Sequence, residues 1–152
     1  MAAIIEHAGR YLLVEEHAAE GVMLNNPAGH LELGESPLEG VQREALEETT
    51  CTFTPDAIVG LYLSRFVREA TGEDVTYLRM AFSGSVGAPD GSRQLDDGIV
   101  RTVWLTVDEI RAQRARHRSA MVMQCIDDHR AGIRHPLSLI TSDATLREPL
   151  RK

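Results

Sequence analysis

The chain has 152 residues, of which 43% are hydrophobic and 26% are charged, and its formal net charge is −7 at pH 7. This length and composition fit a single globular domain. The excess of acidic residues argues against a protein that binds duplex DNA through a broad basic face. An anionic substrate remains compatible with this charge, because a bound divalent cation can invert the local field.

The cysteines and the start of the chain bear on the cellular compartment. Cys51 and Cys125 lie far apart and form no CxxC pair, so we expect two free thiols in a reducing cytosol. The chain shows no signal peptide and no stretch of about 20 apolar residues that could span a bilayer. We therefore expect a cytoplasmic protein outside the membrane. The first expected strand begins next to Met1, which leaves open a native start upstream.

The clearest element of the first half is a helix that begins at Ser36. Pro37 at the first helical position and Glu39 at the third form a capping box with a proline start, and the helix should run to about Thr49. The elements expected before it are, in chain order, a strand at residues 2–5, a turn at 7–10, a second strand at 11–15 and a loop at 17–30.

The second half is expected to add strands and two further helices. The strands are expected at residues 58–67, 75–86 and 99–105, with a polar loop at 87–98. Thr106 and Glu109 form a second capping box, and Ser119 could cap a third helix that ends at Gly132. We expect residues 1–140 to form one domain and residues 141–152 to be a loose C-terminal tail.

Three glutamates crowd one turn of the first expected helix. Glu44, Glu47 and Glu48 lie at i, i+3 and i+4, so their side chains emerge on the same face. From Glu32 to Glu48 the chain has six acids and one base, Arg43. Glutamates alone are more often a solvated surface. Carboxylates this crowded repel one another, however, and a hard divalent cation such as Mg²⁺ would relieve the repulsion.

The spacing around these glutamates follows a longer motif. From Gly29 the chain follows the pattern Gly-x5-Glu-x7-Arg-Glu-U-x-Glu-Glu-x-Gly-U, in which U is apolar, and every charged position is filled. On this motif the chain resembles the Nudix hydrolases. Thr50 stands where the motif has its last glycine, at a helix end where a left-handed residue is common. A threonine there would cost on the order of 1 kcal/mol, or the helix ends by another geometry.

The resemblance implies a fold, a reaction and a metal. The fold is an α/β/α sandwich with a mixed β-sheet and a loop–helix catalytic motif. The reaction is hydrolysis of a phosphoric anhydride, with Mg²⁺ as the cofactor and Mn²⁺ as its substitute. By analogy with the family, Glu44 and Glu48 would be the main metal ligands, and Glu47 would share a metal or position water. The carbonyl oxygen of Gly29, or of Ala28 beside it, would add a ligand.

Two motif positions have supporting roles by the same analogy. Arg43 would not bind metal but would orient a neighbouring glutamate through a charge-assisted hydrogen bond. Glu35 would brace the corner between loop and helix, the alternative being a solvated loop acid. The general base stays open between Glu47 and Glu44.

Segments outside the motif resemble one bacterial branch of the family, phosphatases of nucleoside tri- and diphosphates and of a thiamine-precursor pyrimidine diphosphate. These segments are residues 12–16, 26–32, 78–79, 118–119 and 132–140. The resemblance implies release of orthophosphate from a small-molecule substrate by a monomer or small homo-oligomer. Two alternatives stay open: a pyrophosphohydrolase of nucleotide sugars, dinucleotides or damaged nucleotides, and a non-catalytic nucleotide-sensing domain. A sensing domain would be expected to lose motif glutamates, and here none is lost.

Several other residues are candidates for substrate or metal binding. Arg79, on a strand, could bind phosphate, although exposed strand arginines are common. Asp96 and Asp97 stand where many family members place an additional acid, and a turn-forming pair is the alternative. His30 could touch phosphate or metal, but a structural hydrogen bond is the safer expectation. The candidates for stacking on a base, most of which we expect in the core, are Tyr11, Tyr62, Phe66 and Tyr77. A basic stripe, which solvation would explain, consists of Arg111, Arg114 and Arg118.

Overall fold

The structure is a computed structural model that describes residues 1–68 and 71–148. The strands are β1 (Ala2–His7), β2 (Arg10–Ala18), β3 (Gly21–Asn25), β4 (Cys51–Arg68), β5 (Glu73–Pro89) and β6 (Ile99–Thr106). The α-helices are α1 (Pro37–Thr49), α2 (Val107–Ala112) and α3 (Met121–Arg130). Short 3-10 turns lie at Arg114–Arg116, Leu137–Leu139 and Ala144–Arg147.

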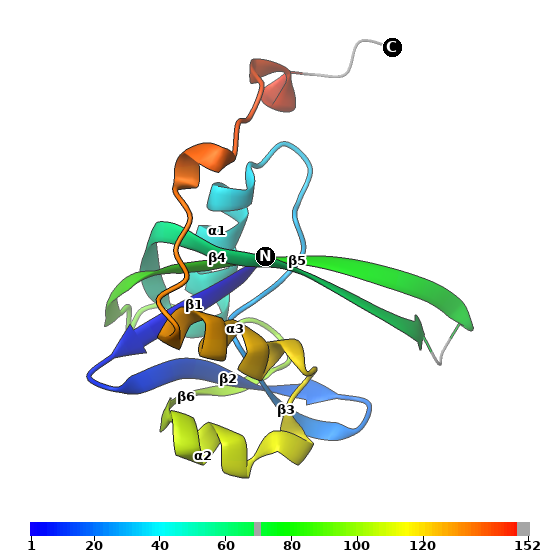
Figure 1. The fold of residues 1–152 in the computed structure, drawn as a ribbon, viewed down its shortest axis with the longest axis vertical. Coiled ribbons are helices and arrows are strands. Elements are labelled where there is room, and N and C mark those ends of the chain that lie inside the picture. The colour runs from blue at the N-terminus through cyan, green and yellow to red at the C-terminus, as the bar shows by residue number, and fades with distance from the viewer. Residues whose placement is uncertain (69–70, 149–152) are drawn as a thin grey trace.

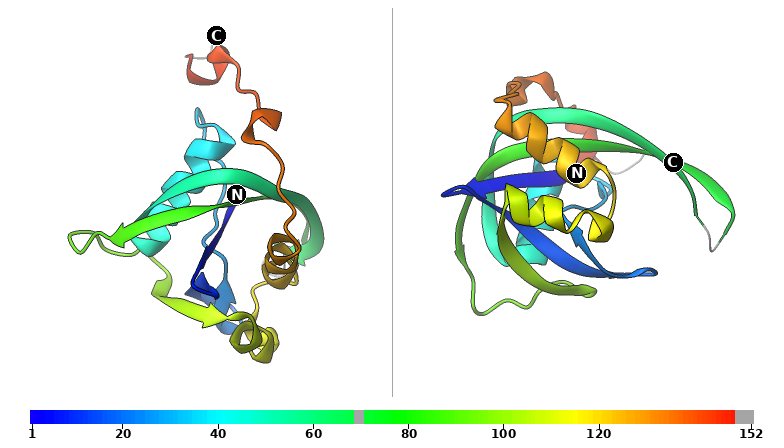
Figure 2. Two further views of the ribbon diagram at one scale, coloured as in Figure 1. Left: turned by 60° about the vertical axis from the view of Figure 1, so that its left-hand side comes forward. Right: turned by 60° about the horizontal axis from the view of Figure 1, so that its bottom comes forward.

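The strands form one six-stranded sheet with the order β3-β2-β1-β5-β4, and β6 also pairs with β2. β1 runs parallel to β5 and antiparallel to β2, so the sheet is mixed. Helix α1 lies on one face of the sheet, and α2 and α3 lie on the other (Figures 1 and 2). The expected α/β/α sandwich with a mixed sheet is confirmed.

Strand alternation explains why both faces of the sheet are covered. Ile4 packs in the core beside α3, whereas Ala3 and Ile5 pack in the core beside α1. Successive side chains of a strand point to opposite faces, so an apolar run such as that of β1 buries both. The α1 face also contains Val41 and Ala45 from the helix itself. These contacts hold the motif helix against the sheet.

Local signals define the ends of α1. The Ser36 hydroxyl accepts a hydrogen bond from the Glu39 main-chain N at 3.3 Å, and the Glu39 carboxylate accepts one from the Ser36 main-chain N at 2.9 Å. At the other end Thr50 adopts the left-handed conformation, with φ of 59°, and its N–H donates to the Leu46 carbonyl oxygen. The expected capping box and helix stop are therefore both present. The second capping box, at Thr106, is also present.

The structure corrects two sequence-based expectations about strands. Part of the expected loop at residues 17–30 is the strand β3, which was missed because only five residues carry its pattern. β4 begins at Cys51, well before the expected residue 58. Pro55 lies in this first part, where the β4–β5 register shifts, because proline cannot donate to a ladder and is tolerated at a bulge. The far part of the β4–β5 hairpin, residues 63–68 and 73–78, extends beyond the rest of the molecule (Figure 1). We call it the arm.

The segment after α3 returns along the sheet toward α1 (Figure 1). His135 forms an isolated bridge with Ile58 of β4, and Arg147 forms an ion pair with Glu39 of α1. The expected tail of residues 141–152 is thus described up to 148, and its last four residues lie outside the described part. The domain boundary at 140 stays a prediction. Within the described residues, no helix has the length and apolar character that crossing a membrane requires.

Candidate active site

Arg43 is the centre of the hydrogen-bond network on the motif helix. Its Nη1 donates to Glu44 Oε1 at 2.9 Å and to Glu47 Oε2 at 3.0 Å. Its Nη2 donates to the His30 carbonyl oxygen at 2.9 Å. One guanidinium therefore joins two of the crowded glutamates to the loop before the helix. Its planar set of five donors is suited to several fixed acceptors at once.

Glu35 connects the same guanidinium to the start of the helix. Arg43 Nε donates to Glu35 Oε2 at 3.0 Å, and Nη2 donates to Oε1 at 2.7 Å. Glu35 Oε1 also accepts from the Glu32 main-chain N at 2.8 Å. The hydrogen bonds from Arg43 hold the pKa of Glu35 below its usual value, and Glu35 in turn raises the pKa of Arg43. Glu35 thus lies between the loop and the helix, and its bracing role, like the catalytic roles of the cluster, stays a prediction.

Glu48 is the buried member of the three glutamates, with 7% of its surface exposed. Its Oε2 accepts a hydrogen bond from the Ala28 main-chain N at 2.8 Å. Burial, together with the negative charges of Glu16, Glu44 and Asp96, raises the pKa of Glu48 to about 8, against the lowering effect of the Ala28 hydrogen bond. The buried position of Glu48 among other acids is thus unfavourable for its negative charge without a cation.

Sequence reasoning missed Glu16. It lies near the end of β2, where Arg118 Nε approaches its Oε1 at 3.0 Å. Two acids at a strand end are usually solvated, so nothing local distinguished it. Asp96, a candidate from the sequence, is brought beside α1, since its main-chain N donates to the Glu47 carbonyl oxygen at 2.9 Å. The structure gives no such connection for Asp97 in the hydrogen bonds of the described residues.

Gly29 lies directly against Glu44. A Cβ at this position would be 2.0 Å from the Glu44 carboxyl carbon, so only glycine leaves that carboxylate its place. The Gly29 carbonyl oxygen, a predicted metal ligand, accepts a hydrogen bond from the amino group of Met1 at 2.5 Å. The loop and the helix therefore meet at the predicted metal site.

The chemistry of these side chains fits a hard cation such as Mg²⁺, which prefers a few carboxylates together with water and phosphate. As they stand, no three acids, histidines or cysteines of the described residues are gathered closely enough to hold an ion. Arg43 lies between Glu44 and Glu47, and Ala28 holds Glu48. Metal binding therefore requires these carboxylates to exchange hydrogen bonds for the ion.

Arg79 lies near this loop but does not contact the glutamates in the described hydrogen bonds. Its Nη1 donates to Asn26 Oδ1 and its Nη2 donates to Asn25 Oδ1, each at 3.2 Å. The two amide oxygens hold its guanidinium beside the segment that leads to Gly29. The prediction that Arg79 binds phosphate stays a prediction.

The remaining aromatic and basic candidates divide into two groups. Tyr11 and Tyr62 lie on the α3 side, where their hydroxyls bond to His129 Nδ1 at 2.8 Å and Asp128 Oδ2 at 2.9 Å. Phe66 and Tyr77 lie on the arm. The expected basic stripe is not a free cationic surface, since Arg111 pairs with Asp127 and Arg118 pairs with Glu16.

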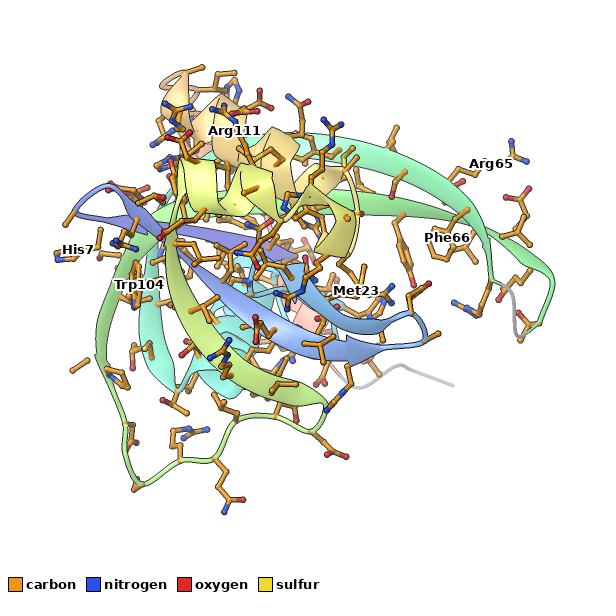
Figure 3. The ribbon with its side chains drawn as sticks, turned by 90° about the horizontal axis from the view of Figure 1, so that it is seen from below. His7, Met23, Arg65, Phe66, Trp104 and Arg111 are labelled. Atoms are coloured by element: carbon orange, nitrogen blue, oxygen red, sulfur yellow. The ribbon has the colours of Figure 1, made fainter. Side chains whose placement is uncertain are left out.

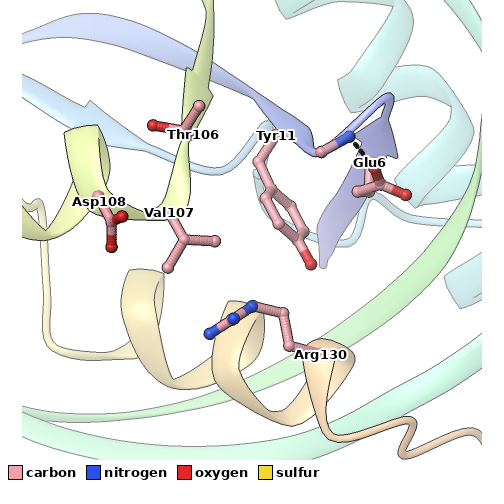
Figure 4. A pocket seen from close by; sticks show the side chains of 7 residues that line it. Glu6, Tyr11, Thr106, Val107, Asp108 and Arg130 are labelled. Carbon is pink, nitrogen blue, oxygen red and sulfur yellow. Dashed lines mark hydrogen bonds between the residues drawn. The ribbon is translucent and has the colours of Figure 1, made fainter.

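A cavity of about 400 Å³ lies away from the motif, at the turn between β1 and β2 and beside α2 and α3 (Figure 4). Its lining residues are Glu6, Gly9, Tyr11, Thr106, Val107, Asp108 and Arg130. Of the predicted site residues only Tyr11 lines it. Charged side chains of both signs, two carboxylates and one guanidinium, line this open space. The acids of the predicted site lie elsewhere, on the loop and α1.

The fold and this site define a Nudix enzyme. The sequence profile of the NUDIX domain matches residues 1–124, and the chain belongs to the Nudix family of hydrolases. It is 28% identical to phosphatase NudJ of Escherichia coli K12. The alignment of 140 residues covers 92% of this chain and 88% of that protein.

Solved structures agree with this assignment. A NUDIX hydrolase from Nitrosomonas europaea is 48% identical, with a TM-score of 0.85, and the match covers 93% of this chain and 94% of that one. The MutT protein from Methanosarcina mazei Go1 is 21% identical, with a TM-score of 0.63 and coverage of 86% and 91%. The second likeness concerns the fold alone.

Proposed function

We propose that this Nudix hydrolase releases orthophosphate from nucleoside di- and triphosphates, or from a thiamine-precursor pyrimidine diphosphate, with Mg²⁺ as its cofactor and Mn²⁺ as the alternative ion. The observation that carries the proposal is the burial of Glu48 and Glu44, 7% and 9% exposed, on one face of α1, because neighbouring buried acids favour a bound cation. The choice of orthophosphate as product rests on the 28% identity with phosphatase NudJ.

The groups that would hold the ion are Glu44, Glu48, Glu47 and the carbonyl oxygen of Gly29. The bound ion would neutralise the charge of the diphosphate and activate a water molecule. Arg43 keeps Glu44 and Glu47 oriented toward the loop through its Nη1. Glu35 fixes that guanidinium in turn, so Glu35 acts through Arg43 rather than on the substrate.

The chain must also accept the proton that the attacking water loses. Glu47 is the leading candidate, since 38% of its side chain is exposed, against 12% for Glu44. Glu44 is the alternative base. Arg79 would meet the phosphate by exchanging the amide oxygens of Asn25 and Asn26 for phosphate oxygens, which match its planar fork.

Product analysis tests the proposal. Purified protein would be incubated with Mg²⁺ and GTP, GDP, ADP-ribose or the pyrimidine diphosphate, and the released product identified. Orthophosphate is the expected product. Release of pyrophosphate and GMP from GTP, or of AMP from ADP-ribose, would replace the proposal with a pyrophosphohydrolase, and no turnover of any member of the panel would replace it with a nucleotide sensor. The reaction would take place in the cytoplasm, where buried thiols such as Cys51 and Cys125 remain reduced.

A further inference from the structure

Three rings form a continuous row from the motif loop onto the arm. His30 packs edge-on against Tyr77, with ring centroids 5.6 Å apart. Tyr77 packs in turn against Phe66, with centroids 5.2 Å apart and ring planes inclined by 60°. We call these residues the aromatic strip. Phe66 lies on the side of the arm toward β3, and Arg65 lies on the opposite side (Figure 3).

The strip begins beside the predicted metal site. His30 follows Gly29, which lies against Glu44, and the His30 carbonyl oxygen accepts a hydrogen bond from Arg43. Tyr77 shares its face of β5 with Arg79, because side chains two residues apart on a strand point the same way. A substrate with its phosphates at the glutamates would therefore have the strip as the adjoining surface.

The rings of the strip remain accessible. Phe66 is 41% exposed and Tyr77 is 37% exposed, whereas the other two phenylalanines, Phe53 and Phe82, are fully buried. The accessible faces of Phe66 and Tyr77 are apolar, flat and next to a site for anions, which is the arrangement that binds a phosphorylated aromatic heterocycle.

We propose that Phe66 and Tyr77 form a stacking platform for the flat heterocycle of the substrate, a nucleobase or a pyrimidine ring. One ring stacks on the heterocycle and the other, inclined to it by 60°, meets its edge, while His30 supports Tyr77 from the motif loop. The platform rests on the proposed function, because it needs a phosphorylated ligand at the glutamates. It accepts different bases, since every base presents a π face and stacking reads no hydrogen-bond pattern. The strip thus selects substrates that carry a ring over those that are phosphate alone.

Equilibrium binding with two probes tests the platform. The first probe is guanosine 5′-(β,γ-imido)triphosphate with Mg²⁺, and the second is imidodiphosphate with Mg²⁺, which has no base. In the double variant F66L/Y77L the Kd of the nucleotide should rise about ten- to a hundredfold, as expected when a base loses its aromatic partners. The Kd of imidodiphosphate should change less than about twofold, because the phosphate site is untouched.

The matched control lies on the other face of the same arm. Leu63 and Leu78 are cross-strand partners, 71% and 58% exposed, so L63A/L78A changes the arm without the rings and should leave both Kd values unchanged. Thermal melting confirms that each variant folds, and Y77L alone replaces the double variant if the latter does not.

Three outcomes would overturn the platform. They are an unchanged nucleotide Kd, an equal weakening for both probes, or the same loss in the control. The proposed function fails separately, if the wild-type protein hydrolyses no substrate of the panel.

Discussion

Arg43 holds Glu35 through two hydrogen bonds, from Nε to Oε2 at 3.0 Å and from Nη2 to Oε1 at 2.7 Å, while its Nη1 reaches Glu44 and Glu47. The loop acid and the helix acids thus share a single cation. The orientation of the Arg43 guanidinium toward Glu44 and Glu47 depends on its two hydrogen bonds to Glu35, because a guanidinium bonded along two of its edges cannot rotate.

Arg43→Lys should separate charge from geometry at this position. Lysine keeps the positive charge but cannot serve five acceptor atoms from one plane, so we expect stability to fall by about 1–3 kcal/mol. The turnover number should fall about ten- to a hundredfold, as is typical when an orienting group is lost.

Urea unfolding of R43K, E35Q and the double variant should give a coupling energy of about 0.5–3 kcal/mol. Arg65→Lys, at an exposed pair with Asp74, is the control and should leave the melting temperature unchanged. Additive single effects would contradict the shared orientation.

Gly29→Ala should displace the Glu44 carboxylate and leave the fold in place. The new Cβ would lie 2.0 Å from the Glu44 carboxyl carbon, and this flexible end of the side chain can move aside at little cost in stability. We expect activity to fall about a hundredfold or more, since a predicted ligand leaves its position. Gly87→Ala is the matched control, because no atom lies within 4 Å of a Cβ at Gly87. If G29A kept wild-type turnover, Glu44 would have no role as a ligand.

The charged part of the site could be predicted because it is local in sequence. Ser36, Pro37 and Glu39 set the start of α1, and helical spacing then puts Glu44, Glu47 and Glu48 on one face. The hydrogen bonds from Arg43 to its neighbours follow from the same short stretch. A single helix with a strong cap is little affected by the rest of the chain.

The parts that the sequence did not reveal depend on contacts between distant segments. Glu16 joins the site only because β2 brings it toward Glu48, and no local pattern marks such a meeting. β3 is too short to show alternation, and Pro55 interrupts the pattern of β4 before the bulge accommodates it. The contact between His30 and Tyr77 likewise joins segments that are far apart in the sequence.

Glu48→Gln should nearly abolish turnover while the protein stays folded. Glutamine keeps the size of the side chain and an acceptor oxygen, but it removes the charge that a divalent ion needs. We expect kcat/KM to fall about a hundredfold or more. The melting temperature without metal should be unchanged or higher, because a buried acid near other acids has been neutralised. Glu32→Gln, on the exposed loop, is the control. Unchanged turnover in E48Q would refute the ligand assignment.

The same variant isolates a pH dependence of stability. The pKa of Glu48 is raised from 4.5 to about 8, so between these values the folded state binds more protons than the unfolded state. The stabilisation that comes from protonated Glu48 is therefore present at low pH and is lost as the pH rises toward 8. Burial lowers the pKa of His129 below 6.5, which gives the opposite slope just below pH 6.5, and E48Q retains that effect.

In chelator, the melting temperature of E48Q minus that of the wild type should thus increase from pH 5 to pH 8. Mg²⁺ should reduce the difference at pH 8, because the ion takes the place of the proton on Glu48. A difference that stays constant with pH would show that Glu48 titrates normally in the folded protein.

Thr50→Gly should stabilise the protein at the end of α1. Thr50 has φ of 59°, a conformation that costs a residue with a Cβ about 1–2 kcal/mol and glycine very little. Glycine also loses more backbone entropy on folding, so the net gain should be about 1 kcal/mol or less. For a chain of this size that corresponds to a rise in melting temperature of up to about 2–4 °C. Thr52→Gly is the matched control, because Thr52 is exposed on β4 without a positive φ, and there glycine should lower the melting temperature. A loss in T50G as large as that in T52G would mean that the buried Thr50 side chain stabilises the turn by more than its backbone conformation costs.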